Sequence, residues 1–135
     1  MFSSELLKKF IELPTPFYFY DTDILRENLK SLSNCLKANN KVFFSVKSNT
    51  NPKILNIISD HKLGIDAVSF NEIKHCLRNG FIADDIVFAG VGKTDKEIED
   101  GIKSNISCFN VESFQELDLF NKLSYNLQEK ILNKI

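Results

Sequence analysis

The sequence predicts an α/β fold in which parallel strands alternate with helices, and three observations support this prediction. Four short apolar runs recur about 22 residues apart, at positions 42–46, 64–68, 85–89 and 107–111. The runs are almost continuously apolar, as is typical of strands buried on both faces. Amphipathic stretches that open with helix-start signals separate them. Strands that alternate with helical patterns indicate βα units and a parallel sheet.

Before this regular series, the sequence predicts one isolated strand and one helix. The strand is the segment 15–20, Thr-Pro-Phe-Tyr-Phe-Tyr, which could belong to another sheet. The helix is indicated by a stripe of leucines at helical spacing, namely Leu25, Leu29, Leu32 and Leu36. We therefore expect residues 1–22 to form an N-terminal segment that can pair with a separate β domain.

Each of the four later helices has its own start signal. Asn51-Pro52 combines an N-cap residue with proline at the first helical position. The other three begin with the pattern of a capping box, in which a hydroxyl and a glutamate each bind a free amide: Ser69 with Glu72, Thr94 with Glu97, and Ser113 with Glu116. Apolar residues follow at helical spacing: Ile54, Leu55 and Ile58; Ile73, Cys76 and Leu77 before Gly80; Ile98 and Ile102; and Leu127, Ile131 and Ile135.

Four βα units do not close a barrel, because a closed barrel of eight units takes roughly 200 residues or more. We therefore expect this chain to be part of a longer protein. Residues 23–135 would be the first half of a (β/α)8 TIM-type barrel. A half barrel leaves apolar edges uncovered, so the chain alone is expected to self-associate.

Composition excludes several function classes. Lys and Arg number 17 against 18 Asp and Glu, a net charge of −1, so no basic excess indicates a nucleic-acid partner. No window approaches the ~18 apolar residues of a membrane span, and the start lacks the pattern of a signal peptide. We expect a cytoplasmic protein. Three scattered cysteines and two histidines indicate no metal site, and His61 and His75 are expected to be solvated.

Chemistry in parallel βα proteins lies at the carboxyl ends of the strands. Lys47 ends the first run, where burial at the rim of an apolar interior would favour its neutral, nucleophilic amine. A lysine that simply enters solvent after a strand is the more frequent case. Asp66 lies inside the second run and needs partners if it is buried. It could pair with Lys47, orient a cofactor, or bind backbone amides.

Further polar residues gather at the same predicted edge. Ser69 and Glu72 follow the second run, although the capping box already explains both. The third run ends in Gly-Val-Gly-Lys-Thr, which includes Gly90 and Lys93, but Val87 stands where a P-loop requires glycine. This segment is either a close approach of backbone to a ligand or a plain tight turn. Asn110 and Glu112 follow the fourth run.

Five ordered motifs between about residue 15 and residue 123 resemble those of diaminopimelate decarboxylases. They are Thr-Pro-Phe-Tyr-Phe-Tyr-Asp (15–21), Phe-Ser-Val-Lys-Ser-Asn-Thr-Asn (44–51), Gly-Ile-Asp-Ala-Val-Ser-Phe-Asn-Glu (64–72), Phe-Ala-Gly-Val-Gly-Lys-Thr (88–94) and Cys-Phe-Asn-Val-Glu-Ser (108–113). The second is similar to the family's cofactor-lysine motif Y-A-x-K-A-N-x-N, and the third to G-x-D-V-V-S-x-G-E. Ser48 and Asn71 depart from the usual alanine and glycine. The fourth favours this family over ornithine or arginine decarboxylases.

The resemblance implies an enzyme that uses pyridoxal 5'-phosphate to convert meso-diaminopimelate into L-lysine and CO2. Lys47 would be the Schiff-base lysine, with Asp66 and Glu72 near the cofactor, in a homodimer of barrels with an added β domain. The phosphate cup and other family residues would lie beyond Ile135, so this stretch alone is expected to be inactive. The alternatives are an ornithine, arginine or carboxynorspermidine decarboxylase of the same superfamily, or a non-catalytic relative that regulates a true decarboxylase.

Overall fold

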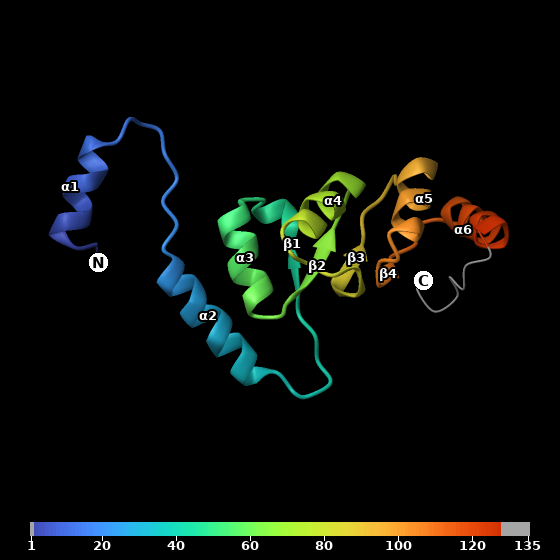
Figure 1. Ribbon diagram of the computed structural model, residues 1–135, viewed down its shortest axis with the longest axis horizontal. Coiled ribbons are helices and arrows are strands. Elements are labelled where there is room, and N and C mark those ends of the chain that lie inside the picture. The colour runs from blue at the N-terminus through green and yellow to red at the C-terminus, as the bar shows by residue number, and fades with distance from the viewer. Residues whose placement is uncertain (1, 128–135) are drawn as a thin grey trace.

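The computed structural model describes residues 2–127, and the side chains of residues 2–123 within them. Helices and strands alternate from residue 43 onwards, as predicted (Figure 1). The helices are α1 (Ser4–Glu12), α2 (Thr22–Cys35), α3 (Pro52–Asp60), α4 (Phe70–Arg78), α5 (Asp95–Lys103) and α6 (Phe114–Leu127). The strands are β1 (Phe43–Ser45), β2 (Gly64–Ala67), β3 (Ile86–Phe88) and β4 (Cys108–Phe109). Short 3₁₀ turns occupy Val46–Ser48 and Ala83–Asp85.

The four strands form one parallel sheet in sequence order, β1-β2-β3-β4. This confirms the predicted series of βα units. Successive strands pair directly, so that Ser45 lies beside Asp66, Asp66 beside Val87, and Val87 beside Cys108. Because the strands are parallel, their carboxyl ends all reach the same edge of the sheet, as the sequence predicts for a site.

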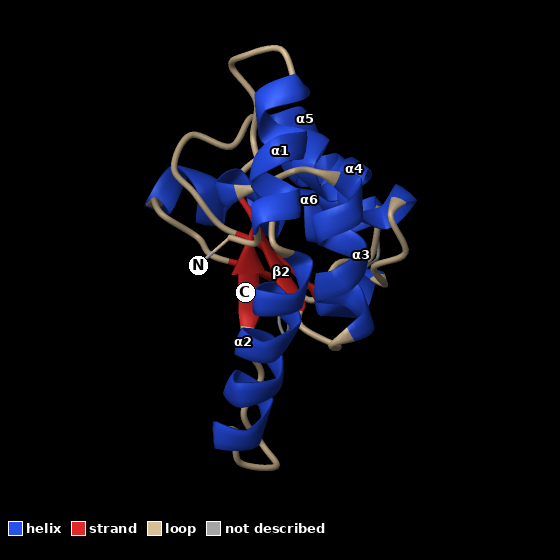
Figure 2. Ribbon diagram, turned by 90° about the vertical axis from the view of Figure 1, so that its left-hand side faces the viewer, coloured by secondary structure: helices blue, strands red, loops and turns tan. Residues whose placement is uncertain are grey.

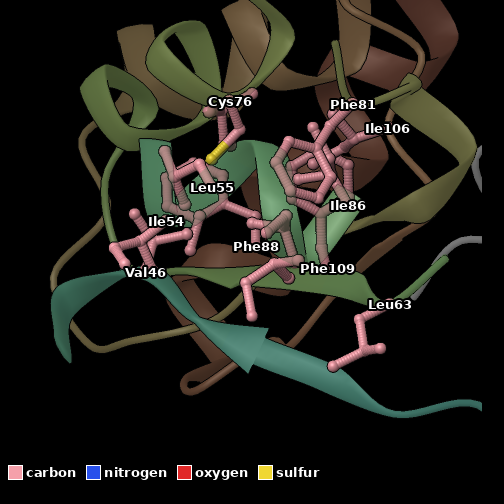
Figure 3. Packing of buried hydrophobic residues seen from close by; sticks show 14 of the residues in the cluster. Val46, Ile54, Leu55, Leu63, Cys76, Phe81, Ile86, Phe88, Ile106 and Phe109 are labelled. Carbon is pink, nitrogen blue, oxygen red and sulfur yellow. The ribbon is translucent and has the colours of Figure 1, made fainter. Parts of the chain in front are cut away.

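The two faces of the sheet differ in burial. Ile65, Ala67, Ile86 and Phe88 are fully buried beneath the helices, and Phe109 is 2% exposed. On this face Phe109 packs against Phe120 of α6, with ring centroids 4.8 Å apart. Figure 3 shows this cluster, with Cys76 of α4 and Leu55 of α3 on its helical side. The alternate residues Ser45, Asp66, Val87 and Cys108 are only half-buried, and we call the face that carries them the open face.

The helix starts follow the predicted chemistry, with one difference. Asn51 caps α3, Ser69 caps α4, and Thr94 forms a complete capping box with Glu97 at α5. At Ser69 and Ser113 the hydroxyl accepts from the amide three residues later, as expected. The two glutamates, however, accept from the amides just before the cap, those of Val68 and Glu112. Glu72 therefore joins the chain after β2 to α4, and Glu116 joins the chain after β4 to α6. Gly80 follows α4 at a φ of +89°, as a helix stop requires.

The expected pairing of the segment 15–20 with a separate β domain stays a prediction. Within the described residues this segment forms no strand, because none of them lies beside it to form a ladder. Its rings pack on α1 instead: Phe10 lies 5.4 Å from Phe17 and 4.9 Å from Phe19 between centroids. Figure 1 shows α1 joined by this extended segment to α2. In α2 the leucine stripe buries Leu29 alone, while Leu32 is 37% exposed.

No helix within residues 2–127 is both long and apolar enough to cross a membrane. The predicted positions Ile131 and Ile135 of the last helix lie outside the described residues.

Candidate functional site

Lys47 is held by its backbone and free at its amine. It lies in the 3₁₀ turn Val46–Ser48, which directly follows β1. Val46, on its N-terminal side, is fully buried. The Asn49 amide donates to the Val46 carbonyl (3.0 Å), and the Ser48 hydroxyl donates to the Ser45 carbonyl (2.7 Å). The Lys47 side chain is exposed and makes no hydrogen bond or ion pair with any described residue. The sequence left open whether the Lys47 amine is buried, and in the structure it is exposed. It lies at the carboxyl edge of the sheet, as expected, and has no partner among the described residues.

Two polar side chains without partners lie next to each other on the open face. Asp66 is half-buried, and no described residue donates to its carboxylate. Ser45 is its register partner on β1. The Ser45 hydroxyl oxygen is buried and has no hydrogen-bond partner within the described chain. Because a buried hydroxyl without a partner costs roughly 1–3 kcal/mol, this pair is suited to meet a polar group that comes from outside the described residues.

Glu72 stands at the first turn of α4, at the same edge. Its carboxylate accepts from the Val68 amide (2.8 Å), and its own amide donates to the Ser69 hydroxyl (3.3 Å). One turn further, burial and then the nearby Glu72 charge raise the pKa of the Cys76 thiol to about 11. Cys76 therefore stays a protonated, apolar core residue. Glu72 thus holds the start of α4 and places a carboxylate at this edge, and its role beside a cofactor stays a prediction.

Lys93 is a buried structural cation. Its side chain is 1% exposed, and its ammonium donates to the Gly90 carbonyl (2.6 Å), the Asn110 carbonyl (2.7 Å) and the Glu116 carboxylate (3.3 Å). Three acceptors match the three hydrogens of an ammonium group. Lys93 therefore ties the ends of β3 and β4 to α6. Gly90 has a φ of +90°, and a Cβ there would lie 3.2 Å from Val68, so glycine fits this turn.

Sequence reasoning missed the second role of Glu116, which it assigned to the helix cap alone. The Glu116 carboxylate accepts from the Glu112 amide (3.0 Å) as well as from Lys93, and the Glu112 side chain itself is exposed. The signal that could have revealed this role is Lys93, which follows the preceding strand. A lysine buried between two strand ends needs a buried carboxylate to balance its charge.

The two histidines, expected to be solvated, are solvated only in part, and the His75 bond itself lies at the surface. Both are half-buried, and each has a ring nitrogen at a backbone carbonyl. In His61 the partner is the Ile57 carbonyl of its own helix (2.8 Å). In His75 it is the Thr50 carbonyl, 25 residues away in the loop that follows Lys47 (2.9 Å). Within the part of the chain that the structure describes, no cluster of three or more metal-ligating side chains is present.

Comparison with known proteins places these features in a family. A model of the pyridoxal-dependent decarboxylase family, pyridoxal binding domain, matches residues 22–135. Diaminopimelate decarboxylase of Bacteroides thetaiotaomicron is 46% identical over 129 residues, which cover 94% of this chain and 33% of the relative. The Campylobacter jejuni enzyme of the same name is 35% identical over 88% of the chain and 30% of its own length. The chain thus spans about a third of the curated relatives it matches.

Solved structures agree in fold. Helicobacter pylori diaminopimelate decarboxylase complexed with L-lysine has a TM-score of 0.85 and 35% identity, covering 93% of this chain and 32% of that one. Ornithine decarboxylase from Entamoeba histolytica has a TM-score of 0.80 at 23% identity, covering 89% of this chain and 39% of that one, which shows a shared fold alone.

Proposed function

The chain belongs to the pyridoxal-dependent decarboxylase family, and from this premise we propose that it is part of a diaminopimelate decarboxylase. The full-length enzyme would convert meso-diaminopimelate into L-lysine and CO2. Relatives at 46% and 35% identity that carry this name support the substrate. A homodimer in the cytoplasm, and a division at about residue 22 between an N-terminal segment and the barrel, belong to the same proposal and rest on family resemblance.

The observation that carries the proposal is the free amine of Lys47 at the carboxyl edge of the sheet. Pyridoxal phosphate is an aldehyde, and the residue that binds it must offer an amine that nothing else occupies. No described carboxylate forms an ion pair with Lys47, so none of the described residues competes for its amine. The unpartnered Ser45 hydroxyl and Asp66 carboxylate lie on the adjoining open face. These donors and acceptors fit a polar, aromatic aldehyde.

The chemistry divides between cofactor and protein. When bound, pyridoxal phosphate supplies an electron sink for the electrons left as the carbon–carboxylate bond breaks. Lys47 would be the residue that holds the cofactor, through its Nζ amine in the unprotonated, nucleophilic form. Asp66 and Glu72 contribute negative charge at the edge and orient what binds there. We assign Ser69, Gly90, Lys93, Asn110 and Glu112 to shaping this edge, because their described contacts are mainly to backbone and to each other.

Borohydride reduction followed by peptide mapping tests the proposal on the native protein at its full natural length. We expect a phosphopyridoxyl group on the peptide that contains Lys47, and no label at Lys53, a nearby exposed lysine. An unmodified Lys47 in cofactor-saturated protein would overturn the assignment. The substrate is then tested by CO2 release from meso-diaminopimelate, ornithine and arginine, each supplied alone. Release from ornithine or arginine without release from meso-diaminopimelate would overturn the substrate but keep the cofactor site.

A further inference from the structure

The hydrogen bond between His75 and Thr50 joins the cofactor-lysine loop to the neighbouring βα unit. His75 Nε2 lies 2.9 Å from the Thr50 carbonyl oxygen. A carbonyl oxygen can only accept, so the ring nitrogen donates. His75 belongs to α4, which follows β2, whereas Thr50 lies between Lys47 and the start of α3. The bond therefore fixes the loop after Lys47 against the helix that carries Glu72.

The other hydrogen bonds of this loop are local. Ser48 donates to Ser45, and the Asn49 amide donates to the Val46 carbonyl. The Asn51 amide donates to the Asn49 side chain (2.9 Å), and the Asn51 side chain caps α3. These bonds give the loop its shape, but each stays within four residues along the chain. Of the hydrogen bonds that residues 48–51 form with described residues, the one from His75 alone reaches another βα unit.

α4 is a firm base for this contact. Ile73 and Cys76, on either side of His75 in sequence, are fully buried in the core. Cys76 belongs to the same buried cluster as Leu55 and Ile54 of α3, and Figure 3 shows all three among its side chains. The Ser69 hydroxyl and the Glu72 carboxylate hold the start of the helix. A donor on such a helix has little freedom to move relative to the sheet.

We propose that His75 is a positioning residue for Lys47. The His75 ring donates to the Thr50 carbonyl and so fixes the path of the backbone after Lys47. This path determines where the Lys47 amine lies when it meets its ligand. This inference rests on the proposed function, because it takes Lys47 as the cofactor lysine. His75 touches no reacting atom in this role. It acts through the loop 48–51.

Three variants of the full-length protein separate this role from mere stability. H75L removes the donor and keeps a side chain of similar length. H75Q keeps an N–H near the position of Nε2. H61L is the matched control. His61 follows the last residue of α3, and its ring bonds to the Ile57 carbonyl of that helix, away from the Lys47 loop. Each variant is measured for the dissociation constant of pyridoxal phosphate, for the absorbance of the lysine-bound cofactor, and for its melting temperature.

A net contribution of about 0.5–1.5 kcal/mol for such a bond corresponds to a factor of roughly two to ten in affinity. We expect H75L to weaken cofactor binding by about three- to tenfold and to shift the absorbance of the bound cofactor. H75Q should return both to within about twofold of the parent protein. H61L should lower the melting temperature but leave affinity and absorbance unchanged. If His75 had a structural role alone, H75L and H61L would both lower the melting temperature, and neither would change the affinity for the cofactor or its absorbance.

The result that overturns the inference is an H75L protein with parental cofactor affinity and absorbance, or an H75L defect that H75Q does not restore. Failure of the proposed function is a separate outcome. In that case the parent protein itself would carry no borohydride-stable label on Lys47, whatever the His75 variants do.

Discussion

Lys93 shows how one side chain can organise an edge that carries chemistry. Its ammonium is buried between the ends of β3 and β4, where each of its three acceptors belongs to a different part of the chain. Burial of a lysine is tolerated only when all of its hydrogens are used and a carboxylate balances its charge. Lys93 therefore has no free donor for a phosphate, which agrees with the failed P-loop pattern around it.

We expect Lys93→Met to destabilise the fold by about 3–5 kcal/mol, because Glu116 would be left buried without its cation. The double variant K93M/E116Q should recover part of this loss, since it removes the charge that the first change leaves unpaired. Urea unfolding followed by far-ultraviolet circular dichroism measures both. Lys96→Met is the control, because Lys96 pairs with Asp100 on the exposed face of α5 and should matter little. Equal midpoints for K93M and K96M would contradict this account.

At the scale of elements, Glu97 joins two helices through one carboxylate. It closes the capping box of α5 with Thr94 and also accepts from the Phe70 amide at the start of α4 (3.1 Å). Burial alone would raise the pKa of Glu97, but the amides of Phe70 and Thr94 and the Thr94 hydroxyl outweigh it, so the pKa is lowered from its usual value of 4.5. The charged carboxylate is therefore the form that stabilises the folded chain.

This direction predicts a pH dependence. A carboxylate with a lowered folded pKa contributes stability above its unfolded value of 4.5, and this contribution disappears as pH falls through the folded value. We expect Glu97→Gln to lose about 1 kcal/mol at pH 7, as is typical for a damaged cap. The difference from the parent protein should shrink on acidification below about pH 4.5. Urea midpoints across this range test it, with E27Q as the control, because Glu27 is exposed on α2 and makes no hydrogen bond or ion pair with a described residue. A difference that stays constant with pH would argue against the carboxylate.

The elements could be predicted from sequence because their signals are local. Apolar runs mark the strands, and Ser69, Thr94 and Asn51 mark helix starts within one turn. The positions of Lys47 after β1 and of Asp66 in β2 could be predicted because they need only the strand order, whereas their roles stay predictions. Contacts between units could not be found in this way. The Lys93–Glu116 and His75–Thr50 bonds join residues 23 and 25 positions apart, and no local pattern distinguishes their side chains from solvated ones. The strand expected at 15–20 also depends on a distant contact, since a ladder needs a partner strand and none of the described residues supplies one.

At the scale of the whole molecule, the described helices cover one face of the sheet only. Figure 2 shows the strands with helices packed against them, and the helix-facing side chains of β2 and β3 are fully buried. The open face, by contrast, leaves Ser45, Asp66, Val87 and Cys108 half-exposed. The relatives are about three times as long as this chain. In those relatives further chain is available to cover such a face, and the unpartnered hydroxyl and carboxylate on it would then meet their partners.

Self-association of the 135-residue chain follows from this exposure. β1 and β4 are the outer strands of the described sheet, and each has one side without a neighbouring strand. Apolar side chains are also exposed at the N-terminal end, among them Ile11 at 84% and Tyr18 at 89%. Unpaired strand edges beside apolar surface are sites at which a second copy can pair.

We expect the chain alone, at 15.5 kDa, to elute in light-scattering chromatography at masses that increase with concentration. The full-length protein is the control, and it should show one concentration-independent mass, because the remaining chain supplies the missing neighbours. A 15.5 kDa species that stays monomeric at all concentrations would mean that the open face and both edges are tolerated in water, and that covering them is not what the rest of the protein contributes.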